Sequence, residues 1–275
     1  MTRFHVVVPT RPPRRAELPE FLTDVRPGGR EPEHRPAARG AELGGLDGVF
    51  VPFDPGGHDP LILAPELLRA SRYLQVTAEF HPAIATPVYA AKVSASLQRY
   101  AAGRLAWQMT VDLPAAVARA HGDFLEGDAR YARADQFLTI ARGVWNDSPF
   151  SYEEEYFQVL DGGLPGSRVP RPFPRVYLSG TSPRALELSA RHADVHVLEA
   201  GEDPALVPEG VEAAVRLPFG LGAPGAEGRL VEEIARRRDQ GVAEFVLVPS
   251  APVADVYAFA QRVLPLVGKE SESVG

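Results

Sequence analysis

Residues 176–185, VYLSGTSPRA, join a short apolar run to hydroxyl residues that stand directly before a proline. Pro183 suits the first turn of a helix, so Ser179, Thr181 and Ser182 would surround the N-terminus of that helix. Free backbone N–H groups and the positive end of the helix dipole favour a phosphate at such a point. A simpler interpretation is that Thr181 or Ser182 only caps the helix. The pattern therefore predicts either a phosphate site or an ordinary cap.

Two histidines stand where they could do acid–base chemistry. His58 is followed by Asp59, and the pair could orient one another so that His58 exchanges protons near neutral pH. The alternative is a solvated histidine in a glycine-rich loop. His81, directly before Pro82, could touch a ligand from the end of a strand.

Arginines offer a possible anion site. Arg11, Arg14 and Arg15 follow the first apolar run and could lie beside Arg216, where guanidinium groups would bind a sulfonate, carboxylate or phosphate. The segment 11–39 also holds many prolines and glycines, which is typical of a solvated surface loop. Both interpretations stay open.

No metal site is predicted. His192 and His196 flank an expected helix-to-strand junction, so they need not share a face, and the acidic run 153–155 is typical of a solvated surface. The chain has no cysteine, which excludes disulfides, thiolate zinc sites and a cysteine nucleophile.

Composition narrows the class of protein. The 275 residues are 45 % hydrophobic and 24 % charged, as in an ordinary globular protein. A formal charge of −7 argues against a nucleic-acid partner, and no apolar stretch approaches the length of a membrane span. We therefore expect a cytoplasmic protein without a membrane partner.

Short β-branched or apolar runs alternate with helix-period segments along the chain. The expected strands are 4–8, 48–53, 74–80, 105–111, 175–178, 195–199, 213–217 and 245–248. Expected helices include 65–71, 87–100, 133–145, 183–191, 227–240 and 253–267. Strands that alternate with helices pair in parallel, and eight such units without a glycine-rich dinucleotide fingerprint favour a closed (β/α)8 TIM barrel over an open sheet.

One domain over residues 1–275 follows from that count, with an insertion between the fourth and fifth strands. This insertion, 114–174, carries a helix and a small β excursion near 150–159 and is too short for a core of its own. Catalytic side chains of such barrels lie at the carboxyl ends of the strands, which is where the candidates above are expected.

Six segments in consecutive order resemble the alkanesulfonate monooxygenase branch of the luciferase-like flavin enzymes. They are DGVFVP (47–52), FHPAIATPVYAAK (80–92), LQRYAAGRL (97–105), Arg130-Tyr131 at a helix start, PFPRVYLSGTS (172–182) and YAFAQRVLPL (257–266). Together they span nearly the whole chain. The resemblance implies a (β/α)8 barrel that uses reduced FMN, supplied by a separate flavin reductase, to activate oxygen on a small organic substrate.

The resemblance also implies roles for single residues. Ser179, Gly180, Thr181 and Ser182 would hold the flavin phosphate with help from Tyr131. Gln108 would lie near the isoalloxazine ring. Phe80 would lie beneath the ring, with a cis peptide bond between Glu79 and Phe80. Arg216 matches a family arginine and would be catalytic. From the residues themselves, and not from the resemblance, we expect His58 to be a second catalytic residue and Arg11 and His81 to bind a substrate, an anionic one if the arginines contribute.

Departures from the family pattern keep other functions open. Gly57, Pro218 and Ser250 stand where the family has a cysteine, a histidine and a tyrosine, and 220–244 is short where the family carries an active-site lid. Easier entry of water puts the oxygen chemistry in doubt. The alternatives are a non-catalytic flavin-binding paralogue, such as a partner subunit of an active homologue, and a deazaflavin-dependent oxidoreductase. A homodimer or a heterodimer with a homologue is expected.

Overall fold

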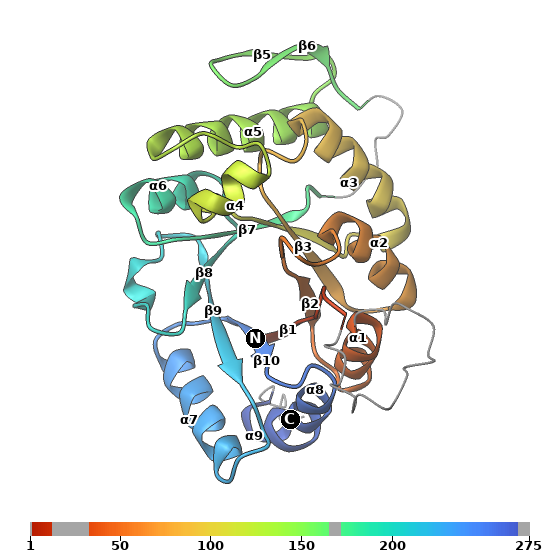
Figure 1. The fold of residues 1–275 in the computed structure, drawn as a ribbon, viewed down its shortest axis with the longest axis vertical. Helices are drawn as coiled ribbons and strands as arrows, with labels where there is room; N and C mark the ends of the chain where they lie inside the picture. Colours follow the sequence, from red (N-terminus) through yellow and green to blue (C-terminus); the bar gives the residue numbers. More distant parts are fainter. Residues whose placement is uncertain (1, 13–32, 165–171, 269–275) are drawn as a thin grey trace, which may run out of the picture.

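Eight parallel strands close into a barrel with the helices packed around its outside (Figure 1). The computed structural model describes residues 2–12, 33–164 and 172–268. The order of strands around the barrel is β1-β10-β9-β8-β7-β4-β3-β2. This confirms the (β/α)8 barrel that the alternation of strands and helices predicts.

The barrel strands lie close to their expected positions. They are β1 (Arg3–Val7), β2 (Gly48–Val51), β3 (Gln75–Phe80), β4 (Leu105–Met109), β7 (Arg175–Ser179), β8 (Val195–Glu199), β9 (Glu212–Phe219) and β10 (Glu244–Pro249). The helices are α1 (His34–Leu43), α2 (Pro60–Ala70), α3 (Pro87–Ala101), α4 (Ala115–Ala120), α5 (Asp128–Asn146), α6 (Pro183–His192), α7 (Ala226–Asp239), α8 (Ala254–Ala258) and α9 (Leu264–Val267). A short 3₁₀ turn, η1 (Pro204–Leu206), and a π-helical turn, η2 (Phe259–Val263), complete the set.

Three helices begin with the same local device. Asp59, Thr86 and Ser182 each accept a backbone N–H of the first turn, and each stands directly before a proline. A cap of this kind satisfies an orphan donor, and proline at the first helical position loses no intrahelical hydrogen bond. The starts of α2, α3 and α6 are therefore set locally, at the ends of the strands where a barrel carries its chemistry.

The long connection between β4 and β7 is the predicted insertion. It contains α4, α5 and an antiparallel hairpin of β5 (Phe150–Glu153) and β6 (Gln158–Gly162), which lies beyond α5 in Figure 1. By contrast, β9 and β10 are joined by a short turn, α7 and four residues, 240–243. No lid-sized insertion lies between β9 and β10, as the length of this segment predicts.

Inward-pointing side chains fill the barrel in layers of four, each layer drawn from alternate strands. Three consecutive layers are closed. They consist of Gly48, Ala106, Val195 and Glu244; of His5, Thr77, Tyr177 and Ala214; and of Phe50, Gln108, Val197 and Val246. All twelve residues are buried, and the eleven other than Gly48 are at most 1 % exposed. We call the last of these the floor layer.

The next layer toward the carboxyl ends of the strands is open. It consists of Val7, Glu79, Ser179 and Arg216, and we call it the mouth layer. Val7, Ser179 and Arg216 are half-buried, whereas the floor layer beneath them is fully buried. Solvent therefore reaches the mouth layer and stops at the floor layer.

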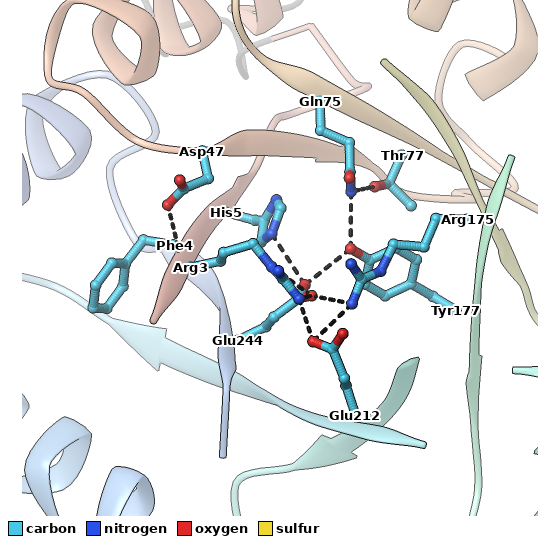
Figure 2. Close-up of polar contacts among 10 residues, drawn as sticks. All are labelled: Arg3, Phe4, His5, Asp47, Gln75, Thr77, Arg175, Tyr177, Glu212 and Glu244. Carbon is cyan, nitrogen blue, oxygen red and sulfur yellow. Dashed lines mark hydrogen bonds and ion pairs between the residues drawn. The ribbon is translucent and has the colours of Figure 1, made fainter. Parts of the chain in front are cut away.

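At the opposite end, charged side chains close the barrel (Figure 2). Glu244 is fully buried, with its carboxylate 3.1 Å from Nε2 of His5 and 2.8 Å from Nη2 of Arg175, and it also pairs with Arg3. Tyr177 donates a hydrogen bond of 2.9 Å to it. We call the cluster the polar plug; it consists of Arg3, His5, Gln75, Thr77, Arg175, Tyr177, Glu212 and Glu244.

The pKa of Glu244 reflects this surrounding. Burial alone would raise it, but His5, Arg175 and Arg3 outweigh the burial and lower the pKa to about 2. Glu244 is therefore a buried, ionised carboxylate whose charge is matched by its neighbours, which is the arrangement that makes a buried charge tolerable.

Candidate functional site

Glu79 lies in the mouth layer as a buried carboxylate, 8 % exposed. Its Oε1 accepts a hydrogen bond from the hydroxyl of Thr110, and its Oε2 accepts the backbone N–H of Phe53 at 3.2 Å. Both donors follow neighbouring strands. Within the described part of the chain, no basic side chain pairs with Glu79.

Gln108 lies beside it in the floor layer, since the register of β3 and β4 pairs Glu79 with Gln108. Gln108 is 1 % exposed, and its Oε1 has no hydrogen-bond partner among the described residues. A buried amide oxygen without a partner is costly, by about 1–3 kcal/mol. Such a group indicates either a local loss of stability or a place reserved for a ligand.

Arg216 lies on the far side of the mouth layer, on β9. Its Nε is buried and makes no hydrogen bond among the described residues. The nearest acid is the exposed carboxylate of Glu199, 3.8 Å away. Most of the donor capacity of this guanidinium is therefore free for an anion.

The loop 179–182 joins the mouth layer to α6. Ser182 caps α6 by accepting the N–H of Ala185 at 3.2 Å, so the capping interpretation of the sequence is correct for this residue. Capping does not exclude phosphate binding, because Thr181 and Ser182 are exposed at the N-terminus of α6, where the helix dipole favours an anion.

Gly180 allows this loop to turn. Its φ of 106° is a conformation that side chains rarely adopt, and a Cβ there would lie 3.1 Å from the Cβ of Ala185. The same Cβ would lie 3.7 Å from the hydroxyl of Tyr131. Loop 179–182 and Tyr131 therefore frame one small space.

Tyr131 contributes a hydroxyl from α5. It donates to the carboxylate of Asp112, which follows β4, and accepts a hydrogen bond of 3.3 Å from Ser182. Burial and the neighbouring Asp112 raise the pKa of Tyr131 to about 12. Its proton is thus held by Asp112 in this structure, and a phosphate would have to compete for it.

Comparison with known proteins decides the family. The model of the luciferase-like monooxygenase family matches residues 2–215, more than three quarters of the chain. The chain belongs to the luciferase-like monooxygenase family. Arg216 lies one residue beyond the matched segment.

Solved structures share the fold of this luciferase-like protein. The EDTA monooxygenase from Chelativorans sp. BNC1 superposes with a TM-score of 0.74 at 18 % identity, over 97 % of this chain and 93 % of that one. An F420-dependent secondary alcohol dehydrogenase in complex with an F420-acetone adduct gives 0.79 at 16 %, over 98 % and 99 %. A riboflavin lyase with modified FMN gives 0.71 at 15 %, over 97 % and 91 %. At these identities the likeness is one of fold.

Several residues that the family resemblance singled out lie away from the mouth layer. The ring of Phe80 packs edge-on against Trp107, 5.1 Å away, on the helix side of the sheet. Glu79, not Phe80, faces into the barrel. The expected cis bond between them is wrong: the cis peptide bond in the described chain is Ser148-Pro149.

His81 is held in a buried network. Its Nε2 lies 3.3 Å from the carbonyl of Val111 and 3.4 Å from Asp123, and its Nδ1 accepts the N–H of Ala83. Burial and the nearby Arg133, which itself binds Asp123, lower the pKa of His81. A neutral, buried and hydrogen-bonded histidine is suited to fixing the segment after β3, rather than to binding substrate directly.

His58 and Arg11 also differ from the expectation. His58 is exposed, and Asp59 uses its carboxylate to cap α2 at 2.7 Å from the N–H of Leu61. Among the described residues, no side-chain contact orients His58. Arg11 is exposed and its guanidinium forms an ion pair with Asp54, rather than joining Arg216 in an anion site. Arg14 and Arg15 lie outside the described residues.

A cleft of about 420 Å³ lies outside the barrel between α5 and α6. Its wall includes Tyr131, but the other charged side chains are already paired across it, Arg184 with Asp128 and Arg191 with Asp135. None of the mouth-layer residues lines it. The unpaired polar groups therefore place the candidate site in the barrel mouth, not in this cleft.

The described residues contain neither a metal-binding cluster nor a membrane-spanning helix. No three His, Asp or Glu side chains there gather in a way that could hold a metal ion. His192 binds Asp135, and His196 binds Ser189. No helix in the described part is both long and apolar enough to cross a membrane.

Proposed function

We propose that this chain is a flavin-dependent monooxygenase, one barrel domain that uses reduced FMN and oxygen on a small organic substrate. The observation that carries the proposal is the unpartnered Oε1 of Gln108 beneath an open mouth. The pyrimidine edge of a flavin offers an N–H donor between two carbonyl groups. A buried amide oxygen is a matching acceptor for that donor.

Loop 179–182 supports the phosphate end of the same cofactor. Gly180 brings the backbone close, Thr181 and Ser182 present hydroxyls, and α6 directs its N-terminus at the space. Tyr131 borders that space and would add its hydroxyl once the phosphate replaces Asp112 as acceptor.

Arg216 and Glu79 would serve the substrate and the reacting centre. Reduced flavin supplies the electrons for oxygen activation when it is bound. Arg216 would hold an anionic group by charge-assisted hydrogen bonds, and Glu79 would hold a donor or accept a proton. A separate flavin reductase would supply the reduced cofactor.

A deazaflavin-dependent oxidoreductase is the second candidate. The F420-dependent alcohol dehydrogenase shares this fold over nearly the full length of both chains, and its cofactor has the same pyrimidine edge and a phosphate. Gln108 and loop 179–182 would hold either cofactor. A third candidate, a non-catalytic flavin-binding paralogue, is favoured by the short connection between β9 and β10.

Equilibrium binding under anaerobic conditions separates these candidates. Reduced FMN, riboflavin and F420 are each titrated into the protein. We expect reduced FMN to bind at least about tenfold more tightly than riboflavin, because only FMN brings a phosphate to α6. Tighter binding of F420 would favour the second candidate. Binding of none of them would contradict a flavin-type cofactor altogether.

Oxygen uptake then distinguishes an enzyme from a paralogue. Oxygen is admitted to the protein loaded with reduced FMN, in the presence of a substrate. The protein should then consume oxygen and form less hydrogen peroxide than the same amount of free reduced FMN forms. Equal peroxide yields with every substrate tested would favour the non-catalytic candidate.

A further inference from the structure

The mouth layer carries a carboxylate and a guanidinium on opposite walls. Three strands separate β3 from β9 in either direction around the barrel, so Glu79 and Arg216 lie across the axis from one another. No ion pair joins them in the described structure. Opposite charges on facing walls that do not pair with one another can bind a ligand that carries both charges.

Glu79 has unused acceptor capacity. A carboxylate offers about four acceptor positions, and the contacts of Glu79 are the hydroxyl of Thr110 and the N–H of Phe53. Burial of a carboxylate without a cation beside it is unfavourable. Glu79 is in this situation, whereas the buried Glu244 has Arg3, His5 and Arg175 around it. An ammonium group in the mouth would supply the missing positive charge.

Gln108 lies next to Glu79 and adds a second hydrogen-bond acceptor on this side of the mouth, the one proposed above for the flavin. It is the register partner of Glu79, and its buried Oε1 has no donor within the described residues. Acceptors therefore gather at the ends of β3 and β4. The donor capacity of the mouth layer lies on β9, where the buried Nε of Arg216 makes no hydrogen bond to any described residue.

We propose that the mouth selects small zwitterionic substrates, with an ammonium group directed at Glu79 and a sulfonate or carboxylate directed at Arg216. This inference deepens the proposed function and rests on it for the reaction, though not for the binding. A plain anion would satisfy Arg216 and leave Glu79 without a cation. A plain amine would satisfy Glu79 and leave Arg216 with only the exposed carboxylate of Glu199, 3.8 Å away.

Three probes with the same three-carbon chain test the proposal: 3-aminopropane-1-sulfonate, propane-1-sulfonate and propan-1-amine. Their dissociation constants are measured by calorimetry, on the cofactor-free protein and on the FMN-loaded protein. We expect the zwitterion to bind about tenfold or more tightly than either partner, since each charge adds a charge-assisted hydrogen bond.

Two variants separate the walls. Glu79→Gln keeps one oxygen to accept the N–H of Phe53, places an NH2 group that can donate to the hydroxyl of Thr110, and removes the charge. The preference for 3-aminopropane-1-sulfonate over propane-1-sulfonate should therefore largely disappear. Arg216→Gln should instead remove the preference for the zwitterion over propan-1-amine, and this half-exposed position keeps the test valid if Glu79→Gln does not fold. Glu126→Gln, an exposed carboxylate near Arg119, is the matched control and should change neither ratio.

The outcomes are distinct from those of the cofactor test. A zwitterion preference in the cofactor-free protein that both wall variants abolish supports the inference, even if FMN does not bind and the proposed function fails. Equal binding of zwitterion and plain sulfonate, a preference that survives both variants, or no binding of any probe up to its solubility overturns it.

Discussion

The two ends of the barrel treat their buried carboxylates in opposite ways. In the polar plug, Glu244 is surrounded by Arg3, His5, Arg175 and the hydroxyl of Tyr177. In the mouth, Glu79 has no cation among the described residues, and Gln108 Oε1 and Arg216 Nε lack hydrogen-bond partners there. Missing hydrogen bonds alone do not separate the two ends, because His5 Nδ1 and Arg175 Nε in the plug also lack a partner. A buried charge that its neighbours match indicates structure, and one left unmatched at the carboxyl ends of barrel strands indicates function.

Breaking the polar plug should have the largest effect. Glu244→Gln leaves two arginines and His5 around a neutral side chain, and loss of one partner of a buried ion cluster costs about 3–5 kcal/mol. Urea denaturation should show a drop of that size in the free energy of unfolding. Glu212→Gln, at an exposed carboxylate of the same cluster, is the control, with about 1 kcal/mol expected. Similar effects of both would contradict a special role for the buried residue.

Acid should act on the polar plug next. Because the folded state lowers the pKa of Glu244 to about 2, from 4.5, its charge stabilises the fold above pH 4.5 and loses this effect as the pH falls toward 2. The stability difference between wild type and Glu244→Gln should shrink by up to about 1.4 kcal/mol per pH unit over that range. Urea midpoints measured from pH 6 to pH 2.5 check this. A constant difference would show that the fold does not lower the pKa of Glu244.

The opposite sign is expected at the mouth. Gln108→Leu removes the unpartnered oxygen from the floor layer and should raise the free energy of unfolding by about 1 kcal/mol, within the 1–3 kcal/mol that such a group costs. Thermal denaturation of the cofactor-free protein measures this. A loss of stability would mean that Gln108 already has the partners it needs, and would remove it from the candidate site.

The smallest effect concerns loop 179–182. Ser182→Ala removes the cap of α6 and should lower the free energy of unfolding by about 1 kcal/mol. It should also weaken the binding of FMN more than the binding of riboflavin. Thr86→Ala, at the cap of α3, should cost a similar amount and leave the ratio of the two affinities unchanged. A change in that ratio for Thr86→Ala would show that the loss of any cap perturbs the site.

Local signals predicted the fold well. Alternating strands and helices gave the barrel, and the hydroxyl-proline pair at 182–183 gave the start of α6 at Pro183. The β excursion near 150–159 is the hairpin of β5 and β6. The helix expected over 253–267 is interrupted by the π-helical turn η2. Each of these features depends mainly on residues close together in the sequence.

Side-chain partners across strands could not be predicted in the same way. His81 lies beside Asp123, and Tyr131 donates a hydrogen bond to Asp112. Both contacts join segments that lie far apart in the sequence. The role of Glu79 in the mouth was not predicted, because in the sequence Glu79 is a single polar residue in an apolar strand. The register beside Gln108 shows that Glu79 faces the mouth. The alternation of inward and outward residues along β3 was the available signal, since it directs Glu79 inward and Phe80 outward.

Binding of reduced FMN to wild type and Gln108→Leu, by anaerobic fluorescence titration, tests most directly whether the mouth holds a flavin. The account predicts saturable binding to the wild type and affinity weakened about tenfold or more in the variant, although the variant is the more stable protein. Equal affinities, or binding to neither protein, would contradict the assignment of the mouth as the cofactor site.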